Sequence, residues 1–285
     1  MKIFKNTIKT AVYVTLVLLL SGPVAYAQYE NVSLRSEMGV PAKTGLTYDI
    51  YAGGMKALHA TLDLSMSKKA YDVSLEAKTQ GMIGKLFPWS ATYSTSGHTD
   101  QGRLVPSLHT SMSEWRQKSK TTEMSFNPKG QVLKTTVQEG ASTVVNRDIK
   151  EELSKDAVDM LTGTLMMMQT AKNAQKCQGT FPVFDGKRRY NISLKGGEMD
   201  KIKKSNYSSF HGAALKCTLR VEPVAGFKDK DKKRGWMAVQ EHTEQRKKLP
   251  TVWLAQVDVN GPAVPVRMEI ASDYGAVVAH LSQKQ

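Results

Sequence analysis

The chain has 285 residues, of which 40% are hydrophobic, and 40 basic against 26 acidic side chains give it a formal net charge of +14. The apolar fraction is sufficient for a buried core, and no stretch after residue 27 is apolar for long enough to form a membrane-spanning helix. These properties exclude a helical membrane protein for the rest of the chain, and they favour a basic, soluble protein.

The first 27 residues predict a secretory signal peptide. Lys2, Lys5 and Lys9 form a basic segment without acidic residues, and residues 11–20 form a short apolar segment. Ala25-Tyr26-Ala27 has the small side chains of a cleavage site. We therefore expect an exported protein of the bacterial periplasm that is soluble after cleavage.

Basic residues gather in three runs, at 201–204, 228–234 and 246–248. A surface of this charge attracts polyanions. Because export separates the protein from nucleic acid, the expected partners are a lipid, lipopolysaccharide or a cell-wall polymer, together with other envelope proteins. The alternative is that these runs are solvated loops that only aid solubility.

Apolar and polar side chains alternate along residues 58–66 and 71–77. This period of two predicts two antiparallel strands with one face in the core, joined by a polar turn at 67–70. Similar segments follow at short spacing as far as Leu281. The sequence therefore predicts a mostly β protein, in which residues 28–285 form a single domain built on a curved antiparallel sheet or spiral β-barrel.

One segment, at about residues 154–173, breaks this alternation and predicts a long apolar helix. Its apolar residues recur every three or four positions, and Ser154 is placed to cap its start. We expect this helix to cover or fill the concave side of the sheet. Two interpretations are open: packing in the core, or a lid over an apolar pocket. The pocket would be lined by Leu62, Leu64, Met160, Leu161, Leu165 and Met168.

The chain contains two cysteines, Cys177 and Cys217. In an oxidising compartment a single pair favours one disulfide. Closing the loop between them stabilises a fold by roughly 4 kcal/mol in the chain-entropy model. Their spacing is not that of a redox-active CxxC pair or of a zinc site.

Two segments carry a resemblance to a known family. They are residues 46–57 (LTYDIYAGGMKA) and residues 184–190 (FDGKRRY). Together they resemble the DUF3108 family of exported bacterial proteins, over roughly residues 45–272. The resemblance implies a curved, spiral β-barrel akin to the envelope-integrity and lipoprotein-carrier half-barrels, and a role in maintaining the Gram-negative envelope. It implies no functional residues, because none is attached to the motifs.

The second of these segments predicts a tight hairpin at Asp185-Gly186. Lys187, Arg188 and Arg189 place three cations at this turn. They are candidate contacts to an anionic surface. The alternative is a structural turn in which Asp185 pairs with an arginine.

The sequence contains no recognisable catalytic motif. The six histidines lack a metal-binding spacing, and no nucleophile elbow or phosphate-binding glycine loop occurs. We therefore assign no catalytic residue, metal or cofactor. The expected function is that of a non-catalytic periplasmic protein that supports envelope integrity and binds a lipid or other amphipathic envelope component in its concave face. The alternative is an envelope hydrolase acting on a cell-wall or lipid substrate, with two carboxylates, or a His and a carboxylate, converging in a cleft.

Overall fold

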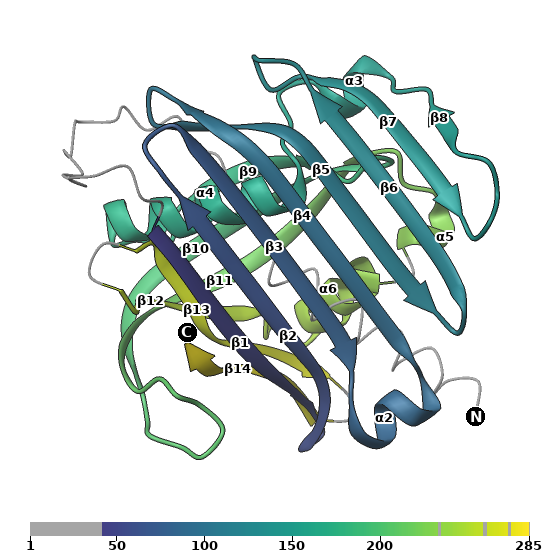
Figure 1. The fold of residues 1–285 in the computed structure, drawn as a ribbon. Coiled ribbons are helices and arrows are strands. Elements are labelled where there is room, and N and C mark those ends of the chain that lie inside the picture. Colours follow the sequence, from purple (N-terminus) through teal and green to yellow (C-terminus); the bar gives the residue numbers. More distant parts are fainter. Residues whose placement is uncertain (1–41, 233–234, 259–260, 273–274, 285) are drawn as a thin grey trace.

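A computed structural model describes residues 42–232, 235–258, 261–272 and 275–284 (Figure 1). The predicted signal peptide lies outside these residues. Within them, fourteen strands form one antiparallel sheet in the order β8-β7-β6-β5-β4-β3-β2-β1-β14-β13-β12-β11-β10-β9. The mostly β character and the curved sheet are confirmed.

The elements have the following bounds. The strands are β1 (Ala42–Ala52), β2 (Met55–Met66), β3 (Ala70–Thr79), β4 (Trp89–Asp100), β5 (Arg103–Trp115), β6 (Lys118–Phe126), β7 (Val132–Glu139), β8 (Val145–Arg147), β9 (Gly179–Phe184), β10 (Arg189–Ile202), β11 (Gly212–Ala225), β12 (Thr251–Gln256), β13 (Ala263–Ser272) and β14 (Gly275–Lys284). The helices are α2 (Gly81–Leu86), α3 (Glu151–Ser154), α4 (Met160–Ala174), α5 (Asp229–Lys232) and α6 (Gly235–Gln245).

The β2–β3 hairpin shows why these segments form strands. On β3, Tyr71, Val73 and Leu75 are buried and alternate with outward polar side chains. Antiparallel pairing places Leu62 opposite Leu75, so that both apolar faces enter the same core. Ser67 closes the turn, since its hydroxyl accepts hydrogen bonds from the backbone of the residues that follow.

The sheet is strongly curved and wraps around α4. Figure 1 shows β2–β7 in front, β9–β13 behind them, and α4 between the two layers. Contacts from α4 reach β3, β4 and β5 on one side and β9, β12 and β13 on the other. The pairing of β1 with β14 joins the two halves of the sheet.

The predicted closure into a barrel is wrong, because in the described residues β8 and β9 are the two ends of the sheet and do not pair with each other. The edge of β9 is occupied instead by the segment that leads into α4. Val158 forms a parallel bridge with Val183 of β9. Its amide donates to the carbonyl of Pro182 at 3.1 Å, and its carbonyl accepts from the amide of Phe184 at 3.0 Å. These two bonds satisfy the carbonyl of Pro182 and the amide of Phe184, two of the backbone groups that barrel closure would otherwise pair.

The predicted long helix at 154–173 is also wrong. The chain forms the short α3, then leaves helical geometry at Asp156, whose φ is 54°, and begins α4 only at Met160. The cap is Asp159 rather than Ser154, because the Asp159 side chain accepts from the backbone amides at the start of α4. The resulting helix has 15 residues.

The predicted disulfide is present. Cys177 and Cys217 are bonded, with a Cα–Cα distance of 5.4 Å. Both cysteines are buried, and the bond ties the chain just after α4 to the middle of β11. The end of α4 is therefore covalently held against the back half of the sheet.

Candidate functional site

The residues of the predicted apolar pocket come together in the closed core. Leu62 and Leu64 lie on β2, and the other four residues lie on α4. All six are buried in one hydrophobic cluster. Core packing, the first of the two interpretations of the apolar helix, accounts for this arrangement.

A buried polar network fixes the start of α4 to the sheet. Asp159 accepts a hydrogen bond of 2.7 Å from the hydroxyl of Thr95, and its carboxylate lies 3.2 Å from Nδ1 of His109. The hydroxyl of Thr162 also donates to this carboxylate and is 2.7 Å from the hydroxyl of Tyr71. The network therefore links α4 to β3, β4 and β5, the strands that carry Tyr71, Thr95 and His109.

The electrostatics of Asp159 suit a structural role. Burial alone would raise the pKa of this carboxyl, but the adjacent His109 and the hydrogen bonds from Thr162 hold it below its usual range. A His and a carboxylate thus do converge, as a hydrolase would require. They do so in the core, where Asp159 is 0% and His109 3% exposed, so a substrate cannot reach them.

The hairpin at 184–190 is a tightly bonded turn. Asp185 accepts from the backbone amides of Lys187 and Arg188 at 3.0 and 2.7 Å, and from Nε of Arg188 at 2.8 Å. The guanidinium of Arg188 also lies over the ring of Phe227, 5.4 Å from its centroid. This is the structural turn with an Asp–Arg pair that the sequence left as the alternative.

The two other cations of the hairpin have partners within the chain as well. Nζ of Lys187 lies 3.7 Å from the carboxylate of Asp231, and Arg189 donates to the carbonyl of Lys155. Binding of an anionic surface at this turn would compete with these contacts. That role of the hairpin stays a prediction.

A different group of cations surrounds a depression of about 510 Å³ on the outer face of β12–β14, which we call the cationic pocket. The sequence alternation shows that this is the face opposite α4, since Ala279 and Leu281 are buried whereas His280 between them is half-buried. The pocket is lined by Asp200, Lys201, Ile202, Lys203, Lys204, Ser205, Tyr207, Trp253, Arg267, Val278 and His280.

The loop after β10 forms one wall of the cationic pocket. Its backbone folds onto β14, where the amide of Ser209 donates to the carbonyl of Leu281 at 2.8 Å and the hydroxyl of Ser208 donates to the same oxygen. This fold places the ring of Tyr207 against the ring of His280, with centroids 6.0 Å apart and an interplanar angle of 26°. Tyr51 meets the same Tyr207 ring edge-on at 5.1 Å.

The floor of the pocket is a cross-strand row. Trp253 on β12 pairs with Arg267 on β13, and Arg267 pairs with His280 on β14. The Arg267 guanidinium lies over the Trp253 ring at 5.2 Å from its centroid. Burial lowers the pKa of His280, and the charge of Arg267 lowers it further, with Glu269 opposing the shift, so the neutral ring is favoured.

The one carboxylate of the lining is already engaged. Asp200 accepts from Nε1 of Trp253 at 2.9 Å and from the backbone amide of Lys201 at 2.8 Å. The bond from Trp253 is the main cause that lowers the pKa of this carboxyl. Four cationic side chains of the lining face this one lining carboxylate, and Glu269 beside the pocket forms an ion pair with one of them, Arg267. Cations still outnumber the two carboxylates, and the pocket favours anions.

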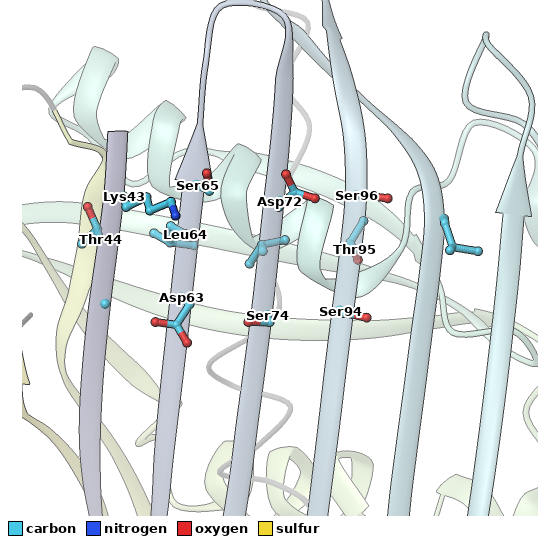
Figure 2. Close-up of a pocket in the computed structure, with 13 residues that line it drawn as sticks. Lys43, Thr44, Asp63, Leu64, Ser65, Asp72, Ser74, Ser94, Thr95 and Ser96 are labelled. Atoms are coloured by element: carbon cyan, nitrogen blue, oxygen red, sulfur yellow. The ribbon is translucent and has the colours of Figure 1, made fainter. Parts of the chain in front are cut away.

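A second, larger depression of about 680 Å³ lies on the outer face of β1–β5 (Figure 2). Serines line it together with Asp63 and Asp72, and only Lys43 contributes a positive charge. Figure 2 shows these polar side chains projecting from neighbouring strands rather than closing around a common point. Its negative balance does not suit an anionic ligand.

The sequence shows only part of the cationic pocket. The run at 201–204 is visible as a basic segment that attracts polyanions. Tyr207, Trp253, Arg267 and His280 are distant in sequence, and only the register of β12–β14 brings the last three together. A periodicity of two places them on an outer face but does not identify their neighbours.

Two further observations concern the described residues. Their His, Cys, Asp and Glu side chains nowhere gather in a set of three that could hold a metal ion. None of the helices found there is long and apolar enough to cross a membrane.

These features define a class of mostly β protein, in which an open, curved sheet wraps around a short buried helix and carries a cationic pocket on its outer face. The chain belongs to the family described as "Protein of unknown function (DUF3108)", whose model matches residues 47–282. This confirms the resemblance seen in the sequence.

A solved structure with a similar fold is titled "Crystal Structure of Beta-barrel-like Protein of Domain of Unknown Function DUF1849 from Brucella abortus". It has 12% sequence identity and a TM-score of 0.46, and the similarity covers 86% of this chain and 97% of that chain. A search of curated proteins gave no match.

Proposed function

We propose that this protein is a non-catalytic periplasmic protein that supports envelope integrity by binding an anionic envelope component at the cationic pocket. The observation that carries the proposal is the excess of cations around a carboxylate that is already hydrogen-bonded to Trp253. The concave face is occupied by α4, so the ligand is placed on the outer face instead. The disulfide and the predicted signal peptide are compatible with an exported protein.

The hydrolase alternative has less support. The His109–Asp159 pair is its best candidate for acid–base chemistry, but both side chains are buried beneath α4 and hold it in place. The cationic pocket offers no second free carboxylate, because Asp200 alone lines it and is bound to Trp253. Binding without catalysis therefore agrees better with the geometry.

The proposal is tested by co-sedimentation of the full mature chain with phosphatidylcholine vesicles, with or without added lipopolysaccharide. Lys203→Glu/Lys204→Glu reverses two charges of the pocket wall. Lys68→Glu/Lys69→Glu makes the same change in net charge at the exposed β2–β3 turn and is the matched control. We expect lipopolysaccharide to recruit the wild-type chain, and added salt to weaken this binding because it screens exposed charges.

The two double variants separate site binding from general attraction. The pocket variant should lose most of the binding, whereas the control should retain it. An equal loss in both variants would show that net charge alone draws the protein to anionic surfaces, and it would contradict the proposal.

A further inference from the structure

The cationic pocket combines a basic rim with one accessible aromatic face. Tyr207 stacks on His280 and contacts Tyr51, and 56% of it is still exposed, so part of its ring is accessible to a ligand. Trp253 is not available in the same way, since it is only 8% exposed and its cross-strand neighbours Lys216 and Arg267 lie over its ring. A ligand ring therefore has Tyr207 as its platform.

The side chain of Arg267 is fixed in place by two contacts within the protein. Its Nη2 donates to Glu269 at 2.7 Å, and its guanidinium is fixed over the Trp253 ring. Its Nε is buried and has no hydrogen-bond partner among the described residues. This buried Nε does not reach a ligand, but the Arg267 side chain as a whole is 33% exposed. The accessible part of its planar guanidinium suits the oxygens of a phosphate group, and an already fixed side chain loses little rotamer entropy on binding.

The lysines extend this positive region toward Tyr207. Lys203 and Lys204 follow β10 directly, and both are exposed in the same loop that carries Tyr207. An exposed ammonium group serves as a mobile point charge and does not define ligand shape. Shape selection consequently falls to Arg267 and Tyr207.

We propose that the ligand of the cationic pocket is a phosphorylated sugar, with its phosphate at Arg267 and the apolar C–H face of its ring against the exposed part of the Tyr207 ring. This inference rests on the proposed function and names the ligand class of the same site. The amphipathic Tyr207 ring supplies apolar contact area at low entropic cost, which a sugar ring uses and a bare phosphate does not.

Isothermal titration calorimetry of the full mature chain tests this inference with three probes: glucose 1-phosphate, inorganic phosphate and adenosine monophosphate. We expect glucose 1-phosphate to bind about three- to tenfold more tightly than inorganic phosphate, the range that one aromatic contact supplies. Tyr207→Ala should remove this advantage, so that the variant binds glucose 1-phosphate and inorganic phosphate with equal affinity. Tyr207→Phe, which keeps the ring, should retain it.

Arg267→Gln provides the second arm, and it should weaken both phosphate-bearing ligands. Its fold is checked by circular dichroism, and Lys118→Gln on β6 is a control that removes one exposed charge far from the pocket. Unchanged binding in Arg267→Gln would overturn the placement of the phosphate.

Other outcomes separate the two proposals. Equal affinity for glucose 1-phosphate and inorganic phosphate, or no effect of Tyr207→Ala, would overturn the sugar inference while recruitment by lipopolysaccharide vesicles through Lys203 and Lys204 still stands. Tighter binding of adenosine monophosphate than of glucose 1-phosphate would also overturn it. If vesicles that contain lipopolysaccharide failed to recruit the wild-type chain, the proposed function itself would be contradicted.

Discussion

Arg147 donates a hydrogen bond of 2.7 Å to the carbonyl of Gly186, and this bond connects the two ends of the open sheet. Arg147 ends β8, and Gly186 lies in the turn between β9 and β10. The sheet is therefore closed at this point by a side chain, although its terminal strands do not pair. The FDGKRRY motif lies at this junction, and its role there is structural.

Gly186 provides the first prediction. Its positive φ and its lack of a side chain next to β6 can be tested separately. Its φ is +83°, and an added Cβ would lie 2.9 Å from Cγ2 of Thr122 on β6. Gly102 has the same φ with nothing within 4 Å, so Gly102→Ala measures backbone strain alone. We expect Gly102→Ala to lower the free energy of unfolding by about 1–2 kcal/mol, and Gly186→Ala to lower it by about 1–3 kcal/mol more through the clash. Urea denaturation measures both, and an equal loss would mean that the turn does not press against β6.

Asp159 provides the second prediction. Replacing it with Asn leaves His109 without its carboxylate in the core, and we expect a loss of about 3–5 kcal/mol in the free energy of unfolding. Asp72→Asn, at an exposed position on β3, should change it by less than about 0.5 kcal/mol. If the two variants were equally stable, the buried network would not hold α4.

The same network has a defined pH dependence. The folded-state pKa of Asp159 lies below its ordinary 3.8, so the unfolded chain binds this proton more readily. Its contribution is present above the unfolded pKa and is lost as the pH falls through the folded pKa. The wild-type chain should therefore lose more stability than Asp159→Asn when the pH is lowered from 6 to about 3. Parallel curves in denaturant titrations would contradict this assignment.

Leu165 distinguishes a core helix from a lid, and this is the third prediction. Leu165 is fully buried on α4, whereas its neighbour Met166 is only partly buried. For a helix packed in the core, Leu165→Ala should cost about 2–5 kcal/mol of unfolding free energy, and Met166→Ala clearly less. A lid that opens freely would give a small loss for Leu165→Ala in thermal or urea unfolding.

The sequence pattern predicts the buried face of α4 correctly but not the residue at which the helix begins. The apolar spacing at Leu161, Leu165 and Met168 predicted a helix on the concave side of the sheet, and these residues are buried there. The start was misplaced because Ser154 and Asp159 are both good capping residues. The left-handed backbone at Asp156 separates α3 from α4, and Val158, two residues later, pairs with β9. That pairing is a long-range contact, which local periodicity does not report.

Closure of the sheet was mispredicted for a related reason. Alternation predicts strands and their buried face, but it does not determine which edges pair. The edge of β9 is taken by Val158, a residue in a segment without strand-like alternation. The cationic pocket could not be predicted for the same reason. Trp253 and His280 become neighbours of Arg267 only through the register of three strands.

His280 supplies the fourth prediction, on the pH dependence of binding. Its pKa lies below the ordinary 6.5 because it is partly buried and near Arg267, with Glu269 opposing the shift. A bound phosphate adds negative charge nearby and should raise this pKa. By linkage, protonation of His280 should favour phosphate binding, while protonation of the phosphate, whose second pKa is about 6, opposes it. The shift of the His280 pKa therefore tests the contact more directly than the affinity does. NMR titration of the His280 ring with and without phosphate measures the change, and His98 on β4 serves as a distant reference. A pKa of His280 that does not respond to phosphate would place the anion elsewhere.

We propose that ligands bind at the cationic pocket on the outer face and not at the concave face, which α4 fills. Backbone amide NMR of the mature chain, titrated with glucose 1-phosphate, distinguishes the two faces. We predict that the shifts concentrate at Lys203, Lys204, Tyr207, Arg267 and His280, while the amides of α4 stay unchanged. Shifts concentrated at Leu161, Leu165 and Met168, with no shifts at the cationic pocket, would show that the ligand binds at the concave face instead.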